Sequence, residues 1–314
     1  MRDMTDEFEV VIVGGGLAGL GAALTLVRAR RSVLVVDSGR PRNAPSGHSH
    51  GFLTRDGMPP LELLRIGRLE VQGYGGEIVD GEVTSLTRHD GGFRVTLDDG
   101  RVRSARRLLV ATGLADELPD VPALAQRWGR DVVHCPYCFG WEMRDRALGV
   151  LASSPHSFTQ ALMWRQWSGN VTFLRHTQEL SDDQLEQLAA RGMPVVDGEV
   201  TGLEIDNDRL RGVRLRSGQL VELDVLVVGP RMRAHHAVLD DLGVSVVEHP
   251  NGIGHQVAAE PGGRAAPGVW VAGNVADVTL GVLQAAASGV TAAVSLNADL
   301  IAEDTSRAMA LTPS

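Results

Sequence analysis

Residues 8–19, FEVVIVGGGLAG, join an apolar run to a glycine-rich turn and decide the fold. The run Phe8–Val13 is rich in β-branched residues, which indicates a buried strand, and the pattern over Leu17–Ala29 has helical spacing. A second strand is expected over Ser32–Val36, directly before Asp37. The order strand, glycine turn, helix, strand and acidic residue is typical of the first unit of a dinucleotide-binding fold.

Three glycines of this turn have separate expected roles. Gly14 permits the tight turn, Gly16 lets the backbone approach a pyrophosphate, and Gly19 lets the helix pack closely on the strand. The helix N-terminus then stabilises the phosphate charge. Asp37 follows Gly19 by 18 residues and is placed to accept hydrogen bonds from a ribose. The full context therefore favours a nucleotide site over a glycine-rich turn without a ligand.

The same pattern recurs in the middle of the chain. Strands are expected over Leu148–Leu151 and Asn170–Leu174, with a helix over Thr159–Trp167 between them. A further buried strand is expected over Val225–Val228. The middle of the chain is therefore an internal repetition of the first unit.

This organisation predicts an α/β fold with two Rossmann-like, three-layer domains. The first domain is expected to be discontinuous, over residues 1–116 and 242–314, and to end in a helix over Thr279–Leu300. The second, over residues 117–241, is inserted into the first.

Composition and charge narrow the classes of function. The chain has 314 residues, of which 43% are hydrophobic, and this length suggests about two domains. The formal net charge is −9 and no basic stripe is visible, so no nucleic-acid partner is expected. The N-terminus is too acidic for a signal peptide, and no apolar stretch approaches the ~18 residues of a membrane span. A soluble, cytoplasmic protein with no membrane partner is expected.

The chain has two cysteines, Cys135 and Cys138, in the segment HCPYCFGWE over residues 134–142. A CxxC pair closes a small disulfide that exchanges readily, and a helix start favours the reactive thiolate. The alternative is half of a zinc site, to which His134 could contribute. A zinc site needs four ligands and the sequence has no second CxxC, so we expect redox chemistry and no metal.

Two further segments resemble the second and third FAD segments of the pyridine nucleotide–disulfide reductases. They are residues 111–113, ATG, and residues 272–277, AGNVAD. With a CxxC in an inserted domain, nearly the whole chain is similar to the low-molecular-weight thioredoxin reductases. The loop over residues 42–53, RNAPSGHSHGFL, and the motif CPYCxGWE resemble the branch of natural-product dithiol oxidases of the holomycin and gliotoxin type.

The resemblance implies FAD as the cofactor and a homodimer as the assembly. Asn274 stands where the family has an aspartate that binds the ribitol, and an amide can still donate and accept there. The helix start near Gln284 would point backbone amides at the flavin. The residues expected at the FAD site are Gly14, Gly16, Leu17, Ala18, Gly19, Asp37, Ser38, Arg42, Asn43, His50, Val83, Ala111, Thr112, Gly113, Gly273, Asn274, Gln284 and Ala285.

The turn over residues 151–157, equivalent to the first glycine turn, gives the expected direction of electron flow. Ala152 and Ser154 stand where a reductase has glycines, and their side chains would crowd a pyrophosphate. Only Arg175 and His176 follow the next strand, where a reductase carries an arginine cluster for the 2′-phosphate. NADPH binding is therefore expected to be weak or lost. We expect a flavin-dependent oxidase that uses O2 and acts on a small-molecule dithiol.

Two alternatives remain open. One is a thioredoxin-type reductase that takes electrons from NADPH or another donor, and the other is a flavin-bound redox sensor without turnover. In the oxidase mechanism that the resemblance implies, a substrate thiolate attacks Cys135, and Cys138 passes electrons to the flavin. Phe139 stands where the family has a titratable residue, so the base is not identified by position. His134 and Glu142 are the local candidates, with His134 suited to proton transfer and Glu142 to orientation.

Overall fold

The computed structural model describes residues 7–311, which divide into two compact units. The first unit contains the chain up to Ala44, Phe52–Ala115, and the chain from Met232 onward. The second contains Pro45–Gly51 and Asp116–Arg231. The α/β class with two Rossmann-like parts is confirmed, but the return to the first unit lies at Met232, ten residues before the expected position. The segment Pro45–Gly51 was expected in the first domain and groups with the second unit.

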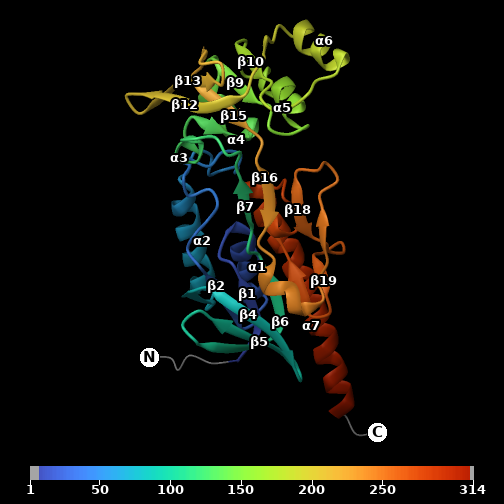
Figure 1. Ribbon diagram of the computed structural model, residues 1–314. Helices are drawn as coiled ribbons and strands as arrows, with labels where there is room; N and C mark the ends of the chain where they lie inside the picture. Colours follow the sequence, from blue (N-terminus) through green and yellow to red (C-terminus); the bar gives the residue numbers. More distant parts are fainter. Residues whose placement is uncertain (1–6, 312–314) are drawn as a thin grey trace. The chain divides into compact units, whose positions relative to one another are not determined.

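The first unit is built on a largely parallel sheet (Figure 1). Its strands, in spatial order, are β19 (Arg264–Ala266), β20 (Val269–Val271), β6 (Val102–Val110), β1 (Glu7–Val13), β2 (Val33–Asp37) and β3 (Glu77–Asp80). Neighbours from β20 to β3 run parallel, so their carboxyl ends meet at one edge. A nucleotide binds at this edge in such folds.

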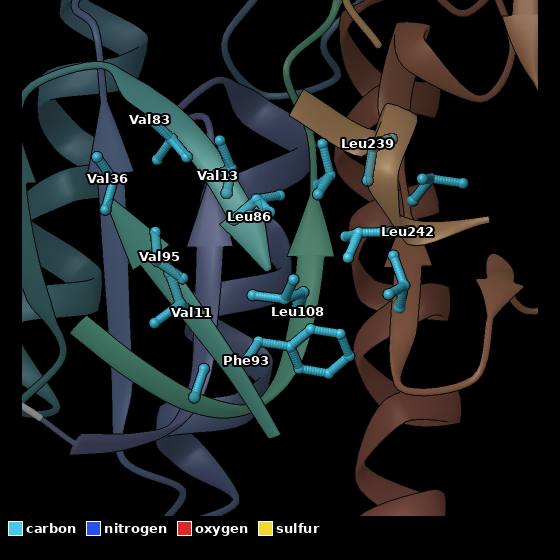
Figure 2. Packing of buried hydrophobic residues seen from close by; sticks show 14 of the residues in the cluster. Val11, Val13, Val36, Val83, Leu86, Phe93, Val95, Leu108, Leu239 and Leu242 are labelled. Carbon is cyan, nitrogen blue, oxygen red and sulfur yellow. The ribbon is translucent and has the colours of Figure 1, made fainter. Parts of the chain in front are cut away.

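One face of this sheet is covered by a β-ribbon, β4 (Val83–His89) and β5 (Gly92–Leu97), and by the short helix η1 (Ala237–Leu242). Alternate residues of β1 point to opposite faces, so Val11 and Val13 join this cluster while Val10 and Ile12 join the other. Figure 2 shows Val11 and Val13 beneath the ribbon with Leu86, Phe93 and Val95. Both faces are therefore buried, which explains the continuous apolar run in the sequence.

The other face carries α1 (Leu17–Arg28), α2 (Pro60–Gly73) and α7 (Val282–Leu311). In Figure 1 α1, in blue, and α7, in red, lie side by side although they come from opposite ends of the chain. Glycines allow this approach: a Cβ on Gly289 would lie 1.9 Å from the carbonyl oxygen of Ala18. A Cβ on Gly21 would lie 2.8 Å from the carbonyl oxygen of Ala286. The close packing brings the third predicted nucleotide segment next to the first.

Helix α7 differs from expectation in bounds and composition. It begins at Val282 and ends at Leu311, rather than spanning Thr279–Leu300. By length and composition it could cross a membrane, with a mean hydropathy of 1.3 and 28% of its most apolar window buried. The expectation that no stretch is apolar enough overlooked it, because alanine supplies much of its apolar character. Its buried side, which includes Gly289, Ala292, Ala293, Leu296 and Leu300, packs in the core of the unit.

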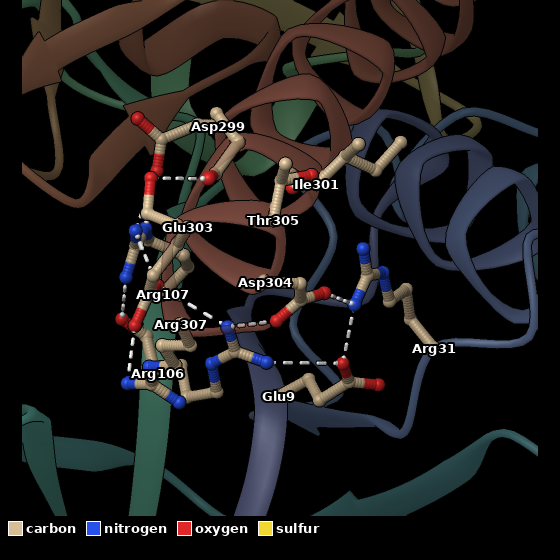
Figure 3. A network of polar contacts seen from close by, with 12 residues as sticks. Glu9, Arg31, Arg106, Arg107, Asp299, Ile301, Glu303, Asp304, Thr305 and Arg307 are labelled. Carbon is tan, nitrogen blue, oxygen red and sulfur yellow. Dashed lines mark hydrogen bonds and ion pairs between the residues drawn. The ribbon is translucent and has the colours of Figure 1, made fainter. Parts of the chain in front are cut away.

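Charged residues fix the C-terminal half of α7 (Figure 3). Asp304 accepts hydrogen bonds from Arg31 at 2.8 Å and from Arg106 at 2.5 Å. Arg31 also donates to Glu9 at 2.6 Å, and Arg107 donates to Asp299 at 2.6 Å. The network ties the helix to the starts of β1 and β2 and to β6.

A smaller four-stranded sheet completes the first unit. Its order is β17 (Val246–Glu248), β18 (Gly254–Val257), β16 (Arg231–Ala234) and β7 (Leu114–Glu117). Met232 of β16 pairs with Gly254 of β18, where a Cβ would lie 1.9 Å from the carbonyl oxygen of Met232. The pairing of β16 explains why the first unit resumes at Met232.

The second unit repeats the parallel sheet on a smaller scale. Its order is β11 (Val195–Val196), β10 (Val171–Leu174), β9 (Leu148–Leu151), β15 (Val225–Val228) and β8 (Val132–Val133), with all neighbours parallel. Its helices are α3 (Leu124–Arg127), α4 (Pro136–Met143), α5 (Ser157–Trp164) and α6 (Asp182–Ala190). A three-stranded antiparallel sheet adds β12 (Val200–Asp206), β13 (Arg209–Leu215) and β14 (Leu220–Glu222). The expected strands over residues 148–151 and 225–228 are confirmed to the residue.

Candidate functional site

The glycine turn after β1 forms an open backbone cradle. Gly14 has φ +103°, and a Cβ there would lie 2.4 Å from the carbonyl oxygen of Ala111. A Cβ on Gly19 would lie 1.9 Å from the carbonyl oxygen of Gly14, whereas one on Gly16 would meet no atom within 4 Å. Gly16 is the N-cap of α1 and supplies no side chain to cap it. The first amides of α1 have no partner within the helix, and this geometry fits a pyrophosphate.

Asp37 lies at the end of β2, as expected, but it is held by a residue that the sequence reasoning missed. Its Oδ1 accepts from the backbone amide of Gly15 at 3.0 Å. Its Oδ2 accepts from Nη1 of Arg68 on α2 at 3.0 Å, and Nη2 of Arg68 donates to Asp80 at 2.6 Å. Each carboxylate oxygen retains acceptor capacity for a ribose hydroxyl. Arg68 lies in the middle of α2, and the helical spacing of that segment is the one sequence signal that could have located it.

The third predicted segment meets the first. Gly273 has φ +73°, and a Cβ there would lie 2.7 Å from the Cβ of Ala18. The amide of Gly273 donates to Oγ of Ser288 at 2.8 Å, and Ala272 donates to the carbonyl oxygen of Val110 at 3.1 Å. The ends of β1, β6 and β20 thus converge, and the expected nucleotide segments of this unit are brought together.

Asn274 has a role that an aspartate could not fill. Its Nδ2 donates to the carbonyl oxygens of Asp277 at 3.1 Å and Leu280 at 3.0 Å. A carboxylate has no proton for these contacts, so the amide shapes the loop before α7. Its Oδ1 is then the acceptor that an approaching hydroxyl group would meet.

The expectation that backbone amides near Gln284 and Ala285 face a ligand concerns the first turn of α7, which begins at Val282. Oε1 of Gln284 accepts from the amide of Gly281 at 2.9 Å, so this side chain closes the turn before the helix. The amide of Ala285 donates to the carbonyl oxygen of Gly281 at 2.8 Å and is therefore engaged within the helix. The amides that a ligand could reach at this end belong to the first turn, before Ala285.

The remaining predicted FAD residues differ from one another in their hydrogen-bond partners and in their exposure. Oγ1 of Thr112 donates to the carbonyl oxygen of His235 at 2.6 Å, and Gly113, at φ +72°, accepts from the amide of His235 at 2.9 Å. Val83 begins β4 with its side chain in the core, 6% exposed, so only its backbone could face a ligand. Leu17, Arg42 and Asn43 are partly buried, whereas Ser38 is exposed.

The two cysteines lie at the start of α4 in the second unit. Cys135 is the N-cap, Pro136 follows at the first helical position, and Cys138 is in the first turn. The two Sγ atoms are 2.7 Å apart, and both thiols are partly buried. The amides of Cys138 and Phe139 both donate to the carbonyl oxygen of Cys135 at 3.1 Å. Both cysteines thus lie at the N-terminus of α4, where the helix dipole favours a thiolate.

Residues around the pair explain why the position after Cys138 is apolar. Phe139 is partly buried and packs on the core of the second unit. A Cβ on Gly140 would lie 2.7 Å from the indole of Trp167, so this glycine lets α4 pack on that ring. Tyr137 and Trp141 are the exposed aromatic side chains of α4, with 75% and 67% of their surface accessible.

Glu142 has a partner that the sequence did not indicate. Its Oε1 lies 3.4 Å from Nε2 of His50. His50 was predicted as an FAD-site residue. Its segment, Pro45–Gly51, groups with the second unit, and its imidazole lies near α4. Glu142 follows Cys138 by one helical turn, so the two lie on one face of α4. An orienting role for Glu142 remains a prediction.

The turn after β9 is filled by its own side chains. Oγ of Ser157 accepts from the amide of Ser154 at 3.3 Å, and the amide of Ser157 donates to the carbonyl oxygen of Ser154 at 3.0 Å. Oγ of Ser153 lies 3.5 Å from the carbonyl oxygen of Gly229 at the end of β15. Ala152 is fully buried. The amide of Ser154, which in a dinucleotide turn would face a phosphate, is thus engaged.

The basic residues after β10 are engaged as well. Arg175 forms ion pairs with Glu179 and with Asp197, the latter at 3.1 Å. Burial lowers the pKa of His176, and its Nδ1 accepts from the amide of Val200 at 3.0 Å. Neither residue presents an unshared cation to a 2′-phosphate. Over residues 7–311, no group of three or more His, Cys, Asp or Glu residues is arranged to hold a metal ion.

Comparisons with known proteins agree with this geometry. Residues 8–291 match the family described as pyridine nucleotide-disulphide oxidoreductase. A solved structure, HlmI, is 46% identical with a TM-score of 0.90, covering 96% of this chain and 95% of that one. An oxidoreductase from Agrobacterium tumefaciens is 36% identical with a TM-score of 0.88, covering 94% and 99%. Thioredoxin reductase aclD from Aspergillus oryzae is 31% identical over 69% of this chain and 70% of its own length. This chain belongs to the pyridine nucleotide–disulphide oxidoreductases and is a thioredoxin reductase-like member of that family.

Proposed function

We propose that this protein is an FAD-dependent dithiol oxidase that closes a disulfide in a small-molecule dithiol and reduces O2 to hydrogen peroxide. The contrast between the glycine turn after β1 and the glycine-free turn after β9 carries the proposal. The first turn offers Gly16 and the start of α1 to a phosphate. In the second turn, Oγ of Ser157 accepts a hydrogen bond from the amide of Ser154. This contrast supports electron entry from a thiol substrate rather than from NADPH.

The residues of the first unit fit FAD. The turn Gly14–Gly19 would hold the pyrophosphate, Asp37 the adenosine ribose, and Asn274 the ribitol. FAD, when bound, accepts two electrons from the cysteine pair and passes them to O2.

The thiol chemistry belongs to Cys135 and Cys138. In the oxidised pair, a substrate thiolate attacks Sγ of Cys135, the bond between the two cysteines breaks, and Cys138 leaves as a thiolate. The second substrate thiolate then attacks the substrate sulfur bound to Cys135, which releases Cys135 and closes the product disulfide. The substrate loses two electrons and two protons, and the cysteine pair gains the electrons. His134 and Glu142 are the proposed groups for proton transfer and orientation.

Oxygen consumption tests the proposal. Wild-type holoenzyme should consume O2 and form equimolar hydrogen peroxide with at least one compound of a panel of small dithiols. Cys138→Ser should lower this rate by roughly 10³-fold, because the second thiol of the relay is lost. Ser217→Ala, in an exposed turn of the same unit, is the matched control and should keep the wild-type rate.

Anaerobic bleaching separates the alternatives. A dithiol should reduce the flavin of the wild type, whereas NADPH should do so at least ~100-fold more slowly. Fast bleaching by NADPH would support the thioredoxin-type reductase. Negligible turnover with O2 and every dithiol would support a flavin redox sensor. Oxidase activity that persists undiminished in Cys138→Ser would contradict the cysteine mechanism.

We further propose a homodimer that forms through α7. Large apolar residues recur along its exposed side: Leu283, Val290, Val294 and Ile301, between 42% and 59% exposed. No charged side chain of α7 is exposed between Leu283 and Ala302, so a second copy of this face fits it better than an acidic or basic partner. Val294→Glu should convert the dimer to a monomer in sedimentation. An unchanged sedimentation coefficient would place the interface elsewhere.

A further inference from the structure

The carboxyl-end edge of the second sheet contains a buried glutamine that contacts His134, the residue before Cys135. Gln160 lies on α5, which follows β9, and its residue surface is 2% exposed. His134 follows β8 at the far side of the sheet, with β15 between β8 and β9. The glutamine side chain therefore reaches past the end of β15 to the residue that precedes Cys135.

Gly229, directly after β15, leaves room for this reach. A Cβ on Gly229 would lie 3.0 Å from Oε1 of Gln160. The φ of Gly229 lies outside the left-handed region, so the backbone conformation does not require glycine there. Space for the amide of Gln160 is the feature that a side chain at this position would remove.

Two side chains of α5 clamp His134. Nε2 of Gln160 lies 3.1 Å from Nδ1 of His134 and 3.3 Å from the carbonyl oxygen of the same residue. Nε1 of Trp164, one turn later on α5, donates to that carbonyl oxygen at 3.4 Å. Trp164 is fully buried, so the clamp belongs to the core of the unit.

The contacts of Gln160 define the protonation of the imidazole. A backbone carbonyl oxygen can only accept, so the atom of Gln160 that bonds to it is the amide nitrogen. The same nitrogen lies 3.1 Å from Nδ1 of His134, and an amide nitrogen can only donate, so Nδ1 is matched to it as the acceptor. In the neutral ring the proton consequently lies on Nε2.

We infer that Gln160 is a positioning residue for His134, which fixes the neutral imidazole as the Nε2–H tautomer and makes it a hydrogen-bond donor to the thiolates of the cysteine pair. The inference rests on the proposed function, in which His134 serves Cys135 and Cys138. It changes the expected role of His134, because the lone pair of Nδ1 is held by Gln160 and Nε2 carries a proton. His134 then stabilises a departing thiolate rather than removing the first thiol proton.

The buried Oε1 of Gln160 supports this assignment. It has no hydrogen-bond partner among the described residues, although an unsatisfied buried oxygen is costly. Turning the amide over would give Oε1 the position beside the carbonyl oxygen of His134, where two acceptors would repel each other. The arrangement seen leaves one acceptor unused to keep both donor contacts to His134.

Three variants and the reduced holoenzyme test the inference. Gln160→Met keeps the side-chain length and removes both hydrogen bonds, and Gln160→Glu keeps the length and replaces the donor with an acceptor. Gln166→Met, at an exposed position just beyond α5, is the matched control. Nitrogen-15 NMR of histidine-labelled protein gives the tautomer, with the His134 signals assigned from His134→Asn.

The wild type and the control should show His134 protonated at Nε2. Gln160→Glu should move the proton of the neutral ring to Nδ1, because the carboxylate accepts from that nitrogen. In Gln160→Met the rate of cysteine alkylation by iodoacetamide near neutral pH should fall roughly fivefold to tenfold, and its pH profile should move to higher pH. The change in KM for a dithiol should be smaller than the change in kcat.

A double variant separates positioning from a structural effect. In the His134→Asn background, Gln160→Met should cause no further shift of the alkylation profile, because the residue through which it acts is gone. A wild-type ring protonated at Nδ1, or a profile shift that persists without His134, would overturn the inference. These measurements use the resting reduced enzyme, so they stand even if no dithiol supports oxygen consumption, which would refute only the proposed function.

Discussion

The turns after β1 and after β9 occupy the same place in two parallel sheets, yet their backbone amides have different partners. In the first turn, a Cβ on Gly16 would meet only open space. In the second, Ser157 accepts from the amide of Ser154, and Arg175 beyond the next strand is paired with carboxylates. A shared topology therefore does not imply a shared ligand, because the side chains decide which groups remain available.

The carboxyl-end edges of the two sheets also differ in the residues that they support. At this edge of the second sheet Gln160 contacts His134, the residue before Cys135, and Gly229 leaves room for the Gln160 amide. The same edge thus carries the predicted cofactor cradle in the first unit and, in our proposal, the thiol chemistry in the second.

Breaking the first turn should have the largest effect. Gly19→Val would place a Cβ 1.9 Å from the carbonyl oxygen of Gly14, so the turn must open and lose the phosphate geometry. We expect the affinity for FAD to fall by about 100-fold or more, because helix and strand can no longer pack closely. The ratio of flavin to protein absorbance after purification measures this loss. Ser154→Ala, in the second turn, should keep the full flavin content. Equal flavin loss in both variants would refute the proposed difference in ligand binding between the turns after β1 and β9.

Removing Asp131 should weaken the second unit alone. Asp131 accepts from Nε of Arg127 at 2.8 Å and from the amide of Leu210 at 2.9 Å, and the Arg127 side chain is only 5% exposed. Asp131→Asn leaves that guanidinium with Asp208 as its remaining carboxylate partner, and should cost about 3 kcal/mol of unfolding free energy. Four of the five tryptophans, Trp128, Trp141, Trp164 and Trp167, lie in this unit, so fluorescence in urea reports mainly its unfolding.

The acid dependence of this contact has a definite sign. Burial pushes the pKa of Asp131 upward, but hydrogen bonds from Arg127 and the amide of Leu210 outweigh it and lower the pKa. The contact therefore stabilises the unit above the unfolded pKa of about 4 and is lost as pH falls through the lower folded value. Flavin content should be unchanged, because the predicted cradle is in the first unit. Simultaneous loss of flavin would contradict the expectation that this change destabilises the second unit alone. Glu186→Gln, at an exposed position, is the control.

Local patterns predicted the sheets, and long-range contacts account for what was missed. The strands over residues 148–151 and 225–228 were located to the residue, because a short apolar run between turns has few alternatives. The start of α7 was placed too early, since Asp277 accepts from the amide of Thr279 at 2.9 Å and holds a turn there. Such a turn delays a helix without changing its apolar pattern.

The site residues divide in the same way, into those that local sequence predicts and those that depend on long-range contacts. The glycine turn could be assigned from spacing alone, because its chemistry is local. Arg68 beside Asp37, His50 beside Glu142 and Gln160 beside His134 each join segments far apart in the chain. No periodicity in the sequence carries such a pairing, so only the folded arrangement shows it.

The smallest expected effect concerns the network that anchors α7 in the first unit. Hydrogen bonds from Arg31 and Arg106 lower the pKa of Asp304, whose side chain is 41% exposed. Asp304→Asn should therefore cost only about 0.5 kcal/mol near neutral pH, since solvent screens the pairs. Because a lowered carboxyl pKa stabilises the fold above about pH 4, the difference from wild type should vanish as the solution is acidified through the folded value. Urea unfolding followed by far-ultraviolet circular dichroism at several pH values measures it, with Asp90→Asn in an exposed turn as the control. A cost that stays constant down to pH 3 would mean that the ionised carboxylate contributes nothing and that α7 is held by its apolar packing on α1 alone.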